Sequence, residues 1–160
     1  NHTEIRDEGL TSAACGGTRV DTFPDVSLCT VLDPIVTPAA PFAAAIVNID
    51  GNRLPQSPRW IANWTARYGV PVGDGEIYAM TDWAYRSRIN FFLYESVEFQ
   101  DKQLLEGGVR AGWQSDSYEL AAFVRNVTND KSAVSGIDFN NLTAMVNEPR
   151  VWGVMAGVRF

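Results

Sequence analysis

The chain has 160 residues, of which 46% are hydrophobic and 20% are charged, and it carries a net charge of -6. This composition is apolar enough to fold, and the negative charge without a Lys/Arg cluster excludes a nucleic-acid-binding surface. The longest apolar run, Pro38 to Val47, is proline-interrupted and far shorter than the about 20 residues of a spanning helix. No targeting segment follows Asn1, so we expect a mature protein or a piece of one.

The first fifty residues read as a short opening strand, Thr3 to Arg6, followed by a long irregular segment rich in Pro, Gly, Thr and Ala. Cys15 and Cys29 lie in that segment, and a disulfide between them would stabilise the fold by roughly 3 kcal/mol on the chain-entropy model. We predict this bond and, with it, an oxidising compartment. The alternative is two unrelated thiols. A zinc site is poorly supported because the chain has one histidine, His2.

Beyond Asp50 the chain alternates between two kinds of side chain with a period of two, which indicates β-strands. In the first run, Trp60 to Val70, one parity is aromatic or aliphatic, and the other holds polar residues such as Asn63 and Arg67. Four more runs follow the same rule, although Phe123 falls on the polar parity of its run. They are Glu76 to Ile89, Leu104 to Gln114, Tyr118 to Thr128 and Val151 to Phe160.

The length of these runs favours membrane-spanning strands. Eleven residues at about 3.3 Å each span about 36 Å, which at a tilt of 45° covers the roughly 25 Å apolar band of an outer membrane. Strands of a soluble sandwich usually stop near five or six residues. Aromatic residues gather near the run ends, where they would meet the headgroup layers. The alternative is that these rings fill a soluble core.

The connections alternate between short and long, as in an outer-membrane barrel. Pro71 to Gly75 and Ser115 to Ser117 are short and would lie in the periplasm, whereas Asn90 to Gln103 and Asn129 to Glu148 are long. The last strand then descends, and the C-terminus is periplasmic. We therefore predict an all-β fold, an antiparallel meander of long strands that forms the C-terminal part of a transmembrane β-barrel.

The parity assigns each face of the predicted sheet to a different environment. Trp64, Ala66, Val109 and Ala111 should face lipid, as should the stripe of the final strand, Trp152, Val154, Ala156, Val158 and Phe160. The opposite parity should face the lumen. Its predicted members include Arg67, Asp82, Arg110, Arg125 and Arg159. Paired charges in a solvated interior are a sufficient explanation for that set, so ligand contact is not assigned to it.

Five or six strands cannot close a barrel, since the smallest single-chain barrels use eight. An open edge in hydrocarbon would leave unpaired N–H and C=O groups that cost several kcal/mol each. We therefore expect the remaining strands to lie upstream of Asn1.

Two segments resemble the TonB-dependent outer-membrane receptors of Gram-negative bacteria. Gly51-Asn52-Arg53-Leu54-Pro55-Gln56-Ser57-Pro58 is similar to the entry to a late barrel strand in that family, and Arg125-Asn126-Val127-Thr128-Asn129 resembles a segment of the penultimate strand. Phe160 resembles the terminal aromatic residue that barrel-assembly machinery reads. With it, the rest of the final stripe would form the assembly signal: Trp152, Val154, Ala156 and Val158. The resemblance covers residues 51 to 160 well and 1 to 50 only loosely.

The resemblance implies a 22-stranded barrel that is filled by a plug domain and energised by the inner-membrane TonB complex. Residues 1 to 50 would be a short strand and a long extracellular loop, residues 51 to 160 the last five strands, and the plug would be absent from this chain. The partners would be outer-membrane lipid, the missing strands and plug, the TonB complex and the assembly machinery. No cofactor is expected. The imported ligand, whether an iron chelate, a vitamin or a saccharide, would contact the loops Gly9 to Asp50, Phe91 to Gln103 and Asp130 to Glu148.

Three other functions stay open at this point: a passive porin-type barrel, a soluble β-sandwich that binds a partner, and a barrel enzyme. A Ser/His/Asp triad is weak, because His2 stands at the start of the chain and no nucleophile elbow accompanies it. We therefore expect no enzymatic activity. The sequence upstream would separate the receptor, with a plug and many more strands, from the porin and the sandwich.

Overall fold

A computed structural model describes residues 2–13, 35–37, 46–95, 99–137 and 143–159 of the chain. The regular structure within these ranges is all-β, and every strand pairing is antiparallel. No helix in these ranges is long and apolar enough to cross a membrane. The chain divides into two compact units, each assembled from three separate stretches of sequence.

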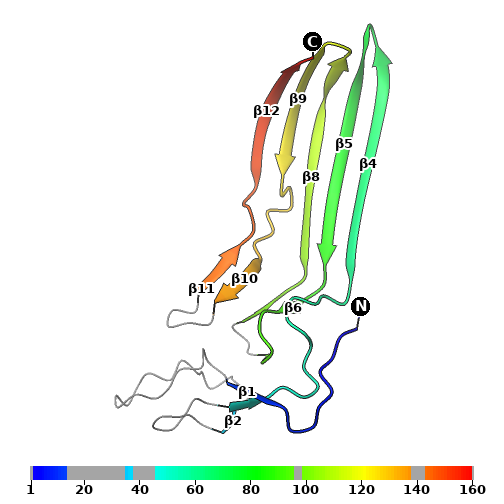
Figure 1. Cartoon of the computed structure of the whole chain (residues 1–160). Helices are drawn as coiled ribbons and strands as arrows, with labels where there is room; N and C mark the ends of the chain where they lie inside the picture. Colours follow the sequence, from blue (N-terminus) through cyan, green and yellow to red (C-terminus); the bar gives the residue numbers. More distant parts are fainter. Residues whose placement is uncertain (1, 14–34, 38–45, 96–98, 138–142, 160) are drawn as a thin grey trace. The chain divides into compact units, whose positions relative to one another are not determined.

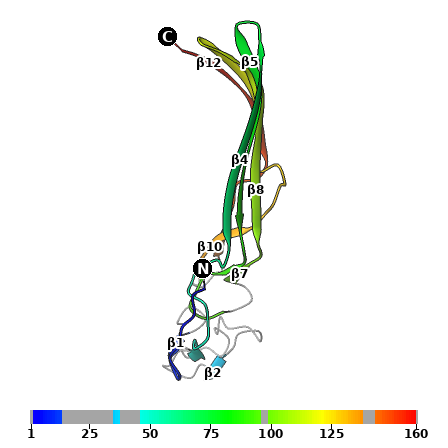
Figure 2. The same cartoon turned by 90° about the vertical axis from the view of Figure 1, so that its right-hand side faces the viewer.

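The larger sheet belongs to the unit made of Trp60–Ser87, Gln103–Ser132 and Asn147–Phe160. Its five strands have the order β12-β9-β8-β5-β4, and Figure 1 shows them side by side as a meander. Figure 2 shows the same sheet from its side, twisted and curved, as the right-handed twist of individual strands requires. The strands are β4 (Ile61–Val72), β5 (Gly75–Arg86), β8 (Leu104–Ser115), β9 (Tyr118–Arg125) and β12 (Val151–Val158).

Tight turns hold this meander in register at one end. Gly73, with a φ of +64°, lies in the turn between β4 and β5, where a residue without Cβ adopts the left-handed conformation at no steric cost. The β4 and β5 strands pair from Ile61 opposite Arg86 to Val72 opposite Gly75 without a bulge. The predicted turn beginning at Pro71 is thus shorter than expected, because Pro71 and Val72 continue the strand.

Gly112 of β8 allows β8 and β9 to approach each other closely. A Cβ on Gly112 would collide with the carbonyl oxygen of Leu120 and with the backbone of Ala121 on β9. Both are main-chain groups, so no rotamer change relieves the contact. The β8 to β9 pairing, in which Gly112 lies opposite Ala121, therefore depends on the absence of a side chain here.

The second unit is made of Asn1–Arg59, Arg88–Lys102 and Ala133–Val146. It contains a three-stranded sheet of order β1-β3-β2 and two hairpins, β6-β7 and β10-β11. These strands are short: β1 (Thr11–Ala13), β2 (Ile35–Thr37), β3 (Ile46–Asn48), β6 (Ile89–Asn90), β7 (Gln100–Asp101), β10 (Ala133–Ile137) and β11 (Thr143–Val146).

This unit has a small apolar core of its own. Val47 is fully buried beside Ile49, and Ile89, Phe91 and Phe99 from the β6-β7 region pack with them. Tyr94 completes the cluster, and the Phe92 ring meets the edge of the Phe99 ring at a centroid distance of 4.7 Å. Segments expected to be separate loops thus share one core.

The structure differs from the predicted opening strand at Thr3 to Arg6. No strand forms there, and the segment is instead tied to the turn around Gly51. The amide of Ile5 donates to the carbonyl of Asn52 at 2.9 Å, and the amide of Gly51 donates to the carbonyl of Ile5 at 2.9 Å. These two hydrogen bonds hold Thr3 to Arg6 in place but do not form the repeated pairing of a β-sheet. The side-chain alternation in this segment therefore does not reflect sheet pairing.

Two further differences concern the long connections. The segment Asn129 to Glu148 is not simply a loop, because it contains the β10-β11 hairpin. Likewise Asn90 to Gln103 contains the β6-β7 pairing, in which Asn90 lies opposite Gln100. The predicted fourth strand also stops three residues early, at Arg125, because Asn126 adopts a φ of +45° that ends the extended backbone.

Candidate functional site

One face of the five-stranded sheet is apolar and exposed. The register aligns Ala79, Ala111, Ala122 and Val154 across four strands, so the residues of one parity share this face throughout. We call it the apolar face. Its large side chains are open, with 80% of Trp152, 80% of Val154 and 75% of Tyr68 exposed. Other exposed members are Trp64, Val70, Ile77, Val109, Tyr118, Leu120 and Val158.

Aromatic rings flank the middle of the apolar face. Toward one end, Trp64 and Trp83 stack with centroids 5.9 Å apart and an interplanar angle of 9°. Trp83 also covers Gly107, where a Cβ would collide with the indole ring. Toward the turn end lie Trp113 and Tyr118, and between the two groups the strands carry mainly Ala, Thr and Val. Two further exposed rings, Trp152 opposite Val124 and Tyr68 opposite Ala79, lie at levels between these two groups, so the aromatic residues of the apolar face are not confined to two levels.

The opposite face, which we call the polar face, carries paired charges around Tyr78. This tyrosine is only 4% exposed, and its hydroxyl donates to Oε1 of Glu119 at 2.6 Å. The guanidinium of Arg110 also pairs with Glu119. Arg67 lies over the Tyr78 ring at 5.0 Å and donates through Nη1 to Glu76 at 3.1 Å. Neighbours on the adjacent strands thus satisfy the Tyr78 hydroxyl and the Glu119 carboxylate, whereas the buried Nε of Arg110 has no hydrogen-bond partner.

All five residues predicted to face a lumen belong to the polar face or adjoin it. Arg67 and Arg110 are in the cluster around Tyr78, and Arg159 reaches Glu119 at 3.8 Å. Arg125 donates to Glu148 at 2.8 Å, and Asp82 lies opposite Gly108 of β8. The structure therefore brings three of the five into one cluster. Their assignment to a barrel lumen stays a prediction.

Asn126 anchors the chain where it leaves β9. Its side chain is 1% exposed and makes four hydrogen bonds. Nδ2 donates to the carbonyls of Asp130 at 2.9 Å and Glu148 at 2.8 Å, while Oδ1 accepts from the hydroxyl of Thr128 and the amide of Asp130, both at 3.0 Å. The segment singled out by resemblance, Arg125 to Asn129, thus forms a hydrogen-bonded turn, and only its first residue is in the strand.

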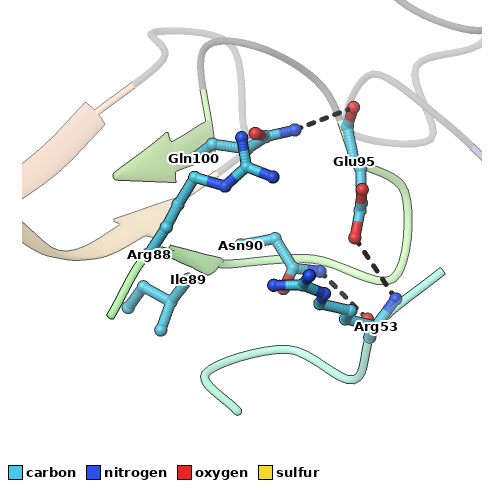
Figure 3. Close-up of a pocket in the computed structure, with 6 residues that line it drawn as sticks. All are labelled: Arg53, Arg88, Ile89, Asn90, Glu95 and Gln100. Carbon is cyan, nitrogen blue, oxygen red and sulfur yellow. Dashed lines mark hydrogen bonds between the residues drawn. The ribbon is translucent and has the colours of Figure 1, made fainter. Parts of the chain in front are cut away.

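A small polar pocket in the other unit was not predicted. It is lined by Arg53 and Arg88, and Figure 3 shows the Arg53 guanidinium beside the Asn90 side chain and the Arg88 guanidinium beside the Gln100 side chain. Asn90 is 5% exposed and donates to the carbonyls of Arg53 at 3.0 Å and Phe92 at 2.7 Å. Glu95 and Gln100 complete the wall with Ile89. The nearest signal in the sequence is the run Arg88-Ile89-Asn90, in which an aliphatic residue separates two polar ones.

Some predicted residues lie outside the described ranges. Cys15, Cys29 and Phe160 belong to this group, so the disulfide and the end of the final stripe stay predictions. The described members of that stripe, Trp152, Val154, Ala156 and Val158, are all exposed on the apolar face. In the described part of the chain, no group of three or more His, Cys, Asp or Glu side chains is placed to hold a metal ion.

Comparison with known proteins adds no further assignment: no family model, curated protein or solved structure matches this chain.

Proposed function

We propose that this chain forms the last strands of an outer-membrane β-barrel, and that the protein carrying it imports a scarce nutrient with energy from a TonB complex. One observation carries the membrane part. Along Tyr118 to Ala122 of β9 and along all of β12 the exposed residues are the apolar ones, such as Leu120 at 62% and Val154 at 80%, while the residues between them are partly or fully buried. A sheet whose apolar face is the open one suits lipid as its solvent.

The strand lengths support the same proposal. The β4, β5 and β8 strands have 12 residues each, and at about 3.4 Å per residue such a strand is about 41 Å long. Tilted by 45°, it rises about 29 Å, enough for the roughly 25 Å apolar band of an outer membrane. The sheet edges β4 and β12 would then pair with further strands, because unpaired backbone groups are costly in hydrocarbon.

The transport part of the proposal rests on the two segments that resemble TonB-dependent receptors, Gly51 to Pro58 and Arg125 to Asn129. In this proposal the polar face is turned to the barrel interior, where its charged cluster is solvated or meets a plug. The stripe of the final strand, from Trp152 to Phe160, would be read by the assembly machinery, and the C-terminus would be periplasmic.

The test uses the full-length protein in a Gram-negative host. Membranes are washed with alkaline carbonate, and the outer-membrane fraction is run on a gel with and without boiling. Retention in the membrane and a heat-dependent shift in mobility are expected for a barrel. Recovery in the soluble periplasmic fraction would indicate a soluble sandwich and would contradict the proposal.

Transport is measured separately, with radioiron-labelled ferric siderophores, radiocobalt-labelled cobalamin and labelled maltodextrin as probes. Uptake of one probe should disappear when the gene is deleted and also when TonB is removed. Uptake that needs the gene but continues without TonB would identify a passive porin. Deletion without effect on any of these probes would count against a receptor for these nutrient classes.

A further inference from the structure

The polar pocket between Arg53 and the β6-β7 hairpin has the properties of an anion site. Within the described residues, neither the Arg53 nor the Arg88 guanidinium makes a hydrogen bond or ion pair. By contrast, three other arginines of the described chain, Arg67, Arg110 and Arg125, each pair with a carboxylate. Two unpaired cations that line one pocket repel each other and favour an anion between them.

The walls of the pocket are held in place by hydrogen bonds that leave the two guanidinium groups unengaged. The Asn90 side chain fixes the backbone carbonyl of Arg53, and the amide of Gln56 donates to the carbonyl of Asn90 at 2.9 Å. Gln100 donates to the carbonyl of Glu95 at 3.3 Å. The apolar core directly underneath includes Ile89, which is 7% exposed. The pocket is therefore built before any ligand arrives, which lowers the entropic cost of binding.

Among the described residues that line the pocket, Glu95 has the one acidic side chain. Its Oε1 accepts from the backbone amide of Arg53 at 3.2 Å. Glu95 therefore positions the backbone of Arg53 and does not pair with its guanidinium group. Two guanidinium charges against one carboxylate leave a net charge of +1 in the lining. The lining still attracts an anion, but less strongly than it would if Glu95 were absent.

The size of the pocket restricts what the anion can be. Its free volume is about 10 Å³, close to the room that one water molecule needs. A single oxygen atom of a ligand fits, with its partner oxygen at the mouth beside the second guanidinium. Planar guanidinium groups bind carboxylates through two parallel hydrogen bonds. We propose that Arg53 and Arg88 bind a carboxylate group of a ligand that otherwise stays outside the pocket.

This inference goes beyond the proposed transport function, because it concerns one unit of the chain and a binding event that needs no TonB complex. The test is therefore made on purified full-length protein by isothermal titration calorimetry, with citrate as the probe. Inorganic phosphate and glycerol are titrated for comparison. Citrate should bind more tightly than phosphate, and glycerol should not bind.

The variants are Arg53→Gln, Arg88→Gln and the double variant, with Arg150→Gln as the matched control. Arg150 is exposed and lies outside the pocket, and its replacement removes the same charge. We expect each single variant to weaken citrate binding about fivefold and the double variant at least about tenfold. The control should change it less than about twofold.

Four results would overturn the proposal: no citrate binding by the wild-type protein, equal or tighter binding of phosphate, an unchanged double variant, or equal weakening by Arg150→Gln. If the arginine variants do not fold, Glu95→Gln decides instead. It keeps an oxygen that accepts from the Arg53 amide and removes the opposing charge, so citrate should bind several times more tightly. Unchanged or weaker binding in that variant would refute the site.

Discussion

The turn at Asn126 gives the sharpest test of how this sheet is held together. Replacing Asn126 with alanine removes four hydrogen bonds from a side chain that is 1% exposed. At about 1 kcal/mol net for each bond, the loss is about 4 kcal/mol. Alanine at a φ of +45° adds about 1 kcal/mol of backbone strain. The expected cost is therefore about 5 kcal/mol.

A matched control exists three residues further along the chain. Asn129 also has a positive φ, +54°, but it is exposed, and no side-chain hydrogen bond is recorded for it in the described structure. Asn129→Ala should therefore carry only the strain, about 1 kcal/mol. The difference of about 4 kcal/mol between the two variants isolates the contribution of the buried hydrogen bonds.

The assay is amide hydrogen exchange of the full-length protein, followed at Val127. Its amide donates to the carbonyl of Gly107 at 2.9 Å and keeps this partner in both variants. With 1.4 kcal/mol for each tenfold change, exchange at Val127 should be about a thousandfold faster in Asn126→Ala than in Asn129→Ala. Equal exchange rates would refute the reasoning, because the turn would then depend on backbone conformation and not on the Asn126 side chain.

Three further outcomes are expected. If the chain is part of the proposed lipid-embedded barrel, Ala111→Arg on the apolar face should destabilise the full-length protein in vesicles by about 2 to 4 kcal/mol, as followed by urea titration. Ala84→Arg on the polar face should cost much less, and similar costs would contradict the assignment of the faces. Gly112→Ala should cost about 1 to 3 kcal/mol, because its Cβ meets the backbone of β9, and an unchanged urea midpoint would show that the strands can separate there. Cys15 and Cys29 should resist alkylation in oxidised native protein until a reductant is added, and immediate labelling of both thiols would exclude the predicted bond.

The long strands could be predicted from the sequence because their side chains alternate over many residues. The run predicted from Leu104 to Gln114, for example, is β8 with one residue added. A strand of twelve residues places six side chains on each face, so the difference between the faces is visible in the sequence. A tight turn, such as the one at Gly73, marks the end of the strand. Where the alternation persists over many residues, the strand predicted from the sequence agrees with the pairing in the sheet.

The unit with the short strands could not be predicted in the same way. Its strands have two to five residues, which is too short for a period of two to be distinguished from chance. Its core combines Val47 with Phe91 and Phe99, and no local pattern shows that these distant residues meet. The Arg53 and Arg88 pocket was missed for the same reason, since each arginine was read only within its own segment.

The unit with the short strands is assembled from three stretches of sequence, which has a consequence for the order of folding. Its residues come from Asn1–Arg59, Arg88–Lys102 and Ala133–Val146, and strands of the large sheet separate these stretches in the sequence. The buried contact between Val47 and Phe99 closes a loop of about fifty residues, and loop closure of this kind slows folding. We expect the β4-β5 hairpin, whose contacts are local, to form early. The unit with the short strands should assemble only after its third stretch has been synthesised. Stepwise truncation of the chain from its C-terminus should therefore abolish burial of the Phe99 ring at a single point, before residue 133 is reached.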